Sequence, residues 1–60
     1  MEEEKFINLL IEGKNKNDIA DIFNVSRDVV EREVKRLYSK YKVYNRIQLA
    51  IVYKLNNKVN

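Results

Sequence analysis

The sequence predicts an all-α fold of four short helices. Three observations favour it: the 60 residues include no proline and a single glycine, apolar residues make up 45% against 35% charged residues, and apolar positions recur with helical spacing in successive segments. Sixty residues are enough for one small domain and leave no room for a second. We therefore expect a single domain over residues 1–60, with helices at about 3–12, 16–23, 27–41 and 45–55.

The first two predicted helices are separated by the only glycine. Glutamates open the chain, where the dipole of the first helix favours negative charge, and Gly13 can end that helix in a left-handed conformation. Asn15 is a suitable cap for the second helix, with Asp18 three residues later. The expected buried residues of the second helix are Ile19, Ala20, Ile22 and Phe23.

The third predicted helix has one apolar and one cationic face. Ser26 is placed to cap it, and Val25 to pack in front of it. On a helical wheel, the apolar side carries Val30, Val34, Leu37 and Tyr41, and the opposite side carries Arg32, Lys35, Arg36 and Ser39. Asn45 is the expected cap of the fourth helix, and we expect residues 56–60 to fray.

Apolar residues surround most of the fourth predicted helix instead of forming one stripe. A single core cannot cover all of them, which indicates that part of this helix contacts a second copy of the chain. We expect a homodimer whose contacts include Leu49, Val52 and Tyr53.

The residue types exclude several classes of function. Without cysteine or histidine, the chain cannot form disulfides, thiolate or imidazole metal sites, or a histidine-activated nucleophile. The acids Glu2 to Glu4 lie at a terminus that is too mobile for acid–base catalysis. We expect no enzyme activity, cofactor or metal. No apolar run approaches the roughly 18 residues of a membrane span, and the acidic start is unlike a signal peptide, so we expect a cytoplasmic protein.

The net charge of +3 is unevenly distributed. Residues 1–21 contain six acids and three bases, whereas residues 22–60 contain three acids and nine bases. This asymmetry favours a polyanion-binding surface on the later helices, although mildly basic helical faces also occur for solubility alone.

The second and third helices, with a break of about three residues between them, have the spacing of a helix-turn-helix, in which the later helix enters the DNA major groove. Short matches continue along residues 2–55 without a gap: Glu12-Gly13-Lys14, Ile19-Ala20, Val25-Ser26, Val30, Arg36-Leu37-Tyr38, Lys40, Val43, Asn45-Arg46 and Leu49-Ala50. Together they resemble the LuxR-type (GerE-type) helix-turn-helix family. The resemblance implies a dimeric, sequence-specific regulator of transcription that binds double-stranded DNA through its third helix and dimerises through its fourth.

The resemblance also assigns roles to individual residues. It makes Ser26 a phosphate contact, places Glu31, Arg32 and Lys35 at base-reading or groove-lining positions, and puts Arg46 on the DNA backbone. Lys14 or Lys16 would reach a phosphate from the start of the second helix, and Arg27 and Arg36 complete the expected DNA-binding set. Arginine and lysine can donate to guanine, and capped helix starts bind phosphate, so the chemistry agrees.

The sequence departs from the family pattern at Asp28, Val29, Glu33 and Lys42. The acids leave alternatives open on the third helix. Asp28 with Arg32 and Glu31 with Lys35 are spaced as intrahelical ion pairs that would only make an exposed face soluble. Glu31 itself could repel phosphate, accept a hydrogen bond from cytosine, or hold Lys35; we favour a mixture of readout and pairing.

Two other functions remain open at this stage. The chain could resemble region four of a sigma factor, which contacts RNA polymerase as well as promoter DNA. It could also be a protein-interaction module in which the apolar fourth helix and the acidic first helix bind another regulator, with the helix-turn-helix as a scaffold. The sequence also leaves open whether the chain is complete or the output domain of a longer regulator.

Overall fold

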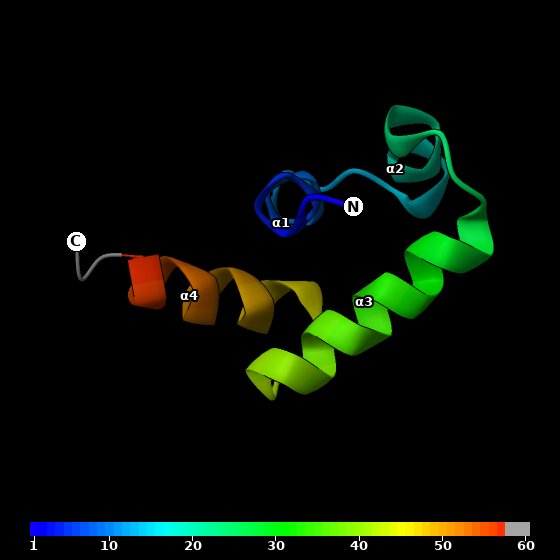
Figure 1. Cartoon of the computed structure of the whole chain (residues 1–60). Helices are drawn as coiled ribbons and strands as arrows, with labels where there is room; N and C mark the ends of the chain where they lie inside the picture. Colours follow the sequence, from blue (N-terminus) through cyan, green and yellow to red (C-terminus); the bar gives the residue numbers. More distant parts are fainter. Residues whose placement is uncertain (58–60) are drawn as a thin grey trace.

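Four helices form the computed structural model of the protein, which describes residues 1–57 (Figure 1). They are α1 (Glu3–Ile11), α2 (Lys16–Phe23), α3 (Arg27–Tyr41) and α4 (Arg46–Asn57). The all-α prediction is confirmed, and α2 and α3 have the expected bounds. The first helix ends one residue early. The fourth begins one residue late and includes Asn56 and Asn57, which we expected to fray; residues 58–60 lie outside the described part.

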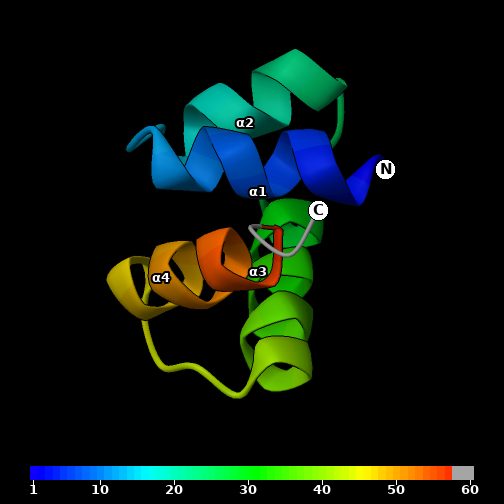
Figure 2. The same ribbon diagram turned by 90° about the vertical axis from the view of Figure 1, so that its left-hand side faces the viewer.

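Helices α3 and α4 each pack against two other helices. Helix α2 and helix α4 both pack on α3, and α1 packs on α4 (Figures 1 and 2). Within residues 1–57, no helix is long and apolar enough to cross a membrane.

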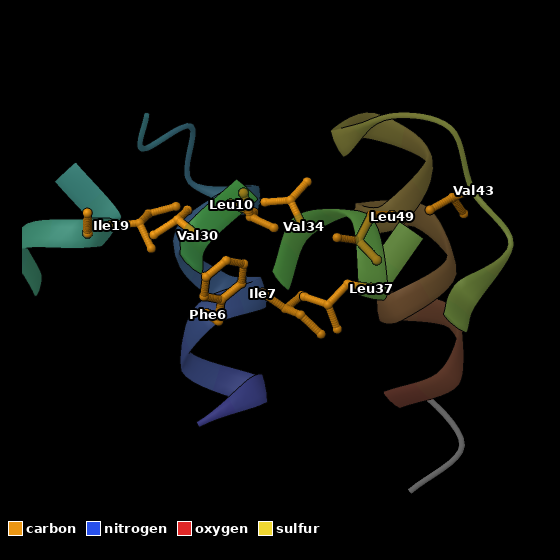
Figure 3. Packing of buried hydrophobic residues seen from close by; sticks show 10 residues of the cluster. Phe6, Ile7, Leu10, Ile19, Val30, Val34, Leu37, Val43 and Leu49 are labelled. Carbon is orange, nitrogen blue, oxygen red and sulfur yellow. The ribbon is translucent and has the colours of Figure 1, made fainter. Parts of the chain in front are cut away.

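One continuous apolar core joins the four helices. Figure 3 shows its side chains in a row that runs from Ile19 on α2 to Leu49 on α4. The buried residues are Phe6, Ile7, Leu10, Ile19, Ala20, Val30, Val34, Leu37, Val43 and Leu49. Two expectations for α2 need correction: Phe23 is half-buried, against the Phe6 ring, and Ile22 is exposed. The covered side of α2 carries Ile19, Ala20 and Phe23, and Ile22 lies at its edge.

Three helices end in the same left-handed turn. Gly13, Asn24 and Lys42 have φ values of 92°, 55° and 57°. In each turn the next amide donates back into the helix that has just ended, for example from Val25 N to Ala20 O at 3.0 Å and from Val43 N to Tyr38 O at 2.9 Å. Glycine adopts this conformation freely and asparagine tolerates it, whereas a lysine pays a steric cost.

Replacing Lys42 by glycine should therefore stabilise the protein. The left-handed conformation costs an L-residue about 1–2 kcal/mol, and the greater freedom of glycine in the unfolded chain offsets part of the gain. We expect the free energy of unfolding in urea to rise by about 0.5–1 kcal/mol. The control is Ser39→Gly, inside α3, which should lower it by about 0.5 kcal/mol. A loss of stability in Lys42→Gly would contradict this account of the turn.

Candidate nucleic-acid interface

Three helices begin with a capped first turn and a cationic side chain. Asn15 Oδ1 accepts from Asp18 N at 2.9 Å, and Ser26 Oγ accepts from Val29 N at 3.3 Å. Asn45 Oδ1 caps α4 by accepting from Gln48 N at 2.9 Å, while Gln48 Oε1 accepts from Tyr44 N at 2.7 Å. The residue that follows each of these caps is Lys16, Arg27 or Arg46. All three caps predicted from the sequence are confirmed.

These three helix starts surround one open hollow of about 390 Å³, which we call the cationic hollow. Its lining residues are Asn15, Lys16, Asn17, Arg27 and Arg46. Figure 2 shows the first turns of α2 and α4 on the same side of the molecule. Unpaired N–H groups at a helix start carry partial positive charge, so the helix ends and the three cations favour an anion in the same place.

A second hollow, of about 410 Å³, lies on the exposed side of α3; we call it the reading-face hollow. It is lined by Asp28, Glu31, Arg32 and Lys35. The structure thus brings together the three residues predicted to face bases, Glu31, Arg32 and Lys35. Two acids balance two bases here, so this surface suits hydrogen bonding to groups of both signs better than general attraction of phosphate.

Glu31 pairs with residues other than the one expected. Its Oε1 lies 3.4 Å from Lys16 Nζ and 3.7 Å from Arg27 Nε. Among the described residues, Glu31 forms no ion pair with Lys35, and Asp28 forms none with Arg32. Both predicted intrahelical pairs are therefore wrong. Arg27 lies one turn before Glu31, and packing of α2 on α3 brings Lys16 close enough to compete.

Arg36 is committed to an ion-pair network at the start of α1. Its guanidinium donates to Glu33 at 2.6 Å and to Glu3 at 2.9 Å, and Glu3 also accepts from Lys40 at 2.8 Å and from the Tyr41 hydroxyl at 3.2 Å. A role of Arg36 in DNA binding stays a prediction, and these ion pairs make it a weaker candidate than the cations of the cationic hollow. The sequence could not reveal the pair with Glu3, because Glu3 is 33 positions away along the chain.

Two predicted contacts, Ser26 and Lys14, are not among the residues that line the cationic hollow. Ser26 is exposed at the start of α3, and Lys14 is exposed in the turn after Gly13. Asn17, which does line it, was missed by the sequence analysis; its place in the first turn of a capped helix was the available signal.

Helix α4 faces the core with the residues we had expected at a dimer surface. Leu49 is fully buried, Val52 and Tyr53 are half-buried against the core, and the Tyr53 ring packs edge-on against Tyr41 at 6.3 Å. The opposite side exposes Ile47, Ile51 and Leu55, with 72%, 56% and 60% of each residue accessible. We call these three the α4 apolar stripe. The α4 apolar stripe leaves more apolar surface exposed than Leu49, Val52 and Tyr53 do, so it is the better candidate for a contact with another molecule.

A family model described as bacterial regulatory proteins of the luxR family (GerE) matches residues 2–53. Neither the curated proteins nor the solved structures gave a significant match to this chain.

The network at Glu3 predicts a pH-dependent contribution to stability. Hydrogen bonds from Lys40 and then Arg36 lower the pKa of Glu3 from 4.5 to about 2. Because the folded-state pKa is depressed, the contribution is complete above about pH 4.5 and is lost as the pH falls towards 2. Since the side chain is partly exposed, we expect Glu3→Gln to cost at most about 1 kcal/mol at pH 7, and almost nothing at pH 2.

Urea unfolding at pH 7, 4, 3 and 2 measures this difference. Glu4→Gln is the matched control, because Glu4 shares the first turn of α1 but has no ion-pair partner among residues 1–57. A cost of Glu3→Gln that stayed constant down to pH 2, or that Glu4→Gln reproduced, would show that the network does not produce it.

Proposed function

Since the chain belongs to the luxR family of bacterial regulatory proteins and is thus a DNA-binding regulatory domain, we propose that it binds duplex DNA sequence-specifically, with α3 in the major groove and the cationic hollow on the backbone. The observation that carries the proposal is the meeting of Lys16, Arg27 and Arg46, each the first residue of a helix, around one hollow beside the exposed face of α3. Since the family is a regulatory one, we propose that this chain has no enzyme activity. Because its proposed ligand is chromosomal DNA, we expect the protein to act in the cytoplasm.

The two hollows have different roles in the proposed recognition of DNA: one binds the backbone and the other reads the bases. A phosphate in the cationic hollow would meet Lys16, Arg27 and Arg46 together with the N–H groups of the helix starts, none of which distinguishes one base from another. The reading-face hollow supplies donors from Arg32 and Lys35, which suit guanine O6 and N7, and an acceptor from Glu31, which suits the amino group of cytosine. Phosphate contacts thus fix the position of α3, and its side chains select the sequence.

We further propose that the active species on DNA is a homodimer joined through the α4 apolar stripe. Ile47, Ile51 and Leu55 recur every four residues and so form one continuous ridge, and Tyr44, 88% exposed, precedes it. Burying such a ridge against its symmetric copy removes apolar surface from water on both molecules. Two copies would then read half-sites about one helical turn of DNA apart.

Arg46→Ala tests the backbone contact. Loss of one phosphate contact should weaken binding to every duplex alike and flatten the plot of log affinity against log salt concentration by about one unit. Fluorescence anisotropy with a labelled duplex at several salt concentrations measures both effects. Arg36→Gln is the control: it also removes one positive charge, but from a side chain already held by Glu3 and Glu33, so the slope should barely change. If the salt slope flattened for Arg36→Gln and stayed unchanged for Arg46→Ala, the DNA interface would lie elsewhere.

Ile51→Lys tests the dimer. A charge in the middle of the α4 apolar stripe should shift the protein towards monomer without unfolding it, because Ile51 is already exposed. Sedimentation velocity, free and with a two-half-site duplex, reads the oligomeric state. Ile22→Lys is the matched control, an exposed isoleucine on α2, and should leave the dimer intact. A wild-type chain that is monomeric under both conditions would refute the dimer and leave RNA polymerase or another regulator as the partner of the stripe.

A further inference from the structure

Glu31 links the two hollows through its ion pairs. It lines the reading-face hollow on α3, and its carboxylate also pairs with Lys16 and Arg27, two of the three cations of the cationic hollow. The side chains of Lys16, Arg27 and Glu31 are 43%, 61% and 38% exposed. The place offered to a DNA phosphate therefore already has a carboxylate at its edge.

A DNA phosphate can readily replace the Glu31 carboxylate at both of its contacts. At 3.4 and 3.7 Å, both separations are longer than a strong charge-assisted hydrogen bond, and water reaches all three side chains. A phosphate oxygen presents the same charge sign and the same acceptor chemistry to lysine and arginine. An arriving phosphate can thus replace the carboxylate without any movement of the helices, since only exposed side chains need to turn.

We propose that Glu31 is an internal competitor for DNA phosphate, which holds Lys16 and Arg27 in the free protein and is displaced from them when the backbone binds. This inference rests on the proposed DNA binding and adds a consequence for specificity. The displaced carboxylate remains on the reading face, near Arg32 and Lys35 and opposite the bases. Where the duplex offers it a hydrogen-bond donor, the displacement is compensated; where it does not, affinity falls. Glu31 thereby lowers binding to non-cognate DNA more than to a cognate site.

The test compares two acids on the same helix face. Glu31→Gln and Asp28→Asn each remove one negative charge from the reading-face hollow, but of these two acids only Glu31 has an ion-pair partner among residues 1–57. On a random-sequence duplex, we expect Glu31→Gln to bind about threefold to fivefold more tightly than wild type, the strength of a surface ion pair. The plot of log affinity against log salt concentration should steepen by up to about one unit. In the wild type, the displaced Glu31 carboxylate takes up a cation from the salt when DNA binds, and glutamine does not. Asp28→Asn should gain clearly less.

A double-mutant cycle identifies the cations involved. In a Lys16→Gln, Arg27→Gln background, Glu31→Gln should no longer raise the affinity for duplex DNA, because the carboxylate then has neither cation to pair with. Equal gains in Glu31→Gln and Asp28→Asn would overturn the proposal, since they would show only a general effect of net charge. A gain that persists without Lys16 and Arg27 would overturn it as well. Circular dichroism and thermal unfolding confirm that each variant is folded.

A DNA-free measurement separates this proposal from the proposed function. Titration with inorganic pyrophosphate, followed through the amide NMR signals of residues 16–18, reports anion binding at the cationic hollow directly. We expect tighter pyrophosphate binding in Glu31→Gln than in wild type or Asp28→Asn. That result, with no duplex binding by any variant, would support the competition and refute DNA binding. Equal pyrophosphate affinities alongside normal duplex binding would refute the competition and leave DNA binding intact.

Discussion

The left-handed turns that end α1, α2 and α3 are the constraint on which the rest of the structure depends. Each lets the chain leave one helix and reach the cap of the next within two or three residues, at Asn15, Ser26 and Asn45. Short connections leave little freedom in the direction of the following helix, and the apolar residues after two of these turns, Val25 and Val43, pack on the core. The turns thus set the places of three helix starts, and with them the cations around the hollow.

The charges at the helix starts support the proposal that the cationic hollow binds an anion. Helix α1 begins with acids, as its dipole favours, and Glu3 gains hydrogen bonds from Arg36 and Lys40. Each of the other three helices begins with a base, where the dipole of the helix is repulsive, although the first turns of α2 and α3 also contain one acid each, Asp18 and Asp28. A small domain has little stability to lose, so three such positions around one hollow favour the proposed anionic ligand. The carboxylate of Glu31 beside them agrees with the proposed competition for that ligand.

Helix α4 has two apolar sides, one that packs in the core and one that is exposed to water. Leu49, Val52 and Tyr53 complete a core that three short helices would leave open, which is why the buried row of side chains extends from α2 to α4. Ile47, Ile51 and Leu55 add nothing to that core and remain in water. The fold is therefore complete without the α4 apolar stripe, and the stripe is available for an intermolecular contact, so a substitution there should separate assembly from folding.

The sequence by itself determined the all-α class, the three side-chain caps and the turn at Gly13, because caps, turns and helical periodicity are local properties of a few neighbouring residues. Its resemblance to the family also named Lys16, Arg27 and Arg46 as DNA-binding candidates. Tertiary structure decided the rest. On a helix that is apolar on two sides, local pattern cannot tell whether Leu49 or Ile51 faces the core; packing on α1 and α3 decides it. Likewise Glu31 was expected to pair with Lys35 on its own helix, but it pairs with Lys16 of α2 as well as with Arg27. Arg36 pairs with Glu3 of α1 as well as with Glu33. A long charged side chain pairs with whatever folding brings within reach, and sequence spacing alone does not contain that information.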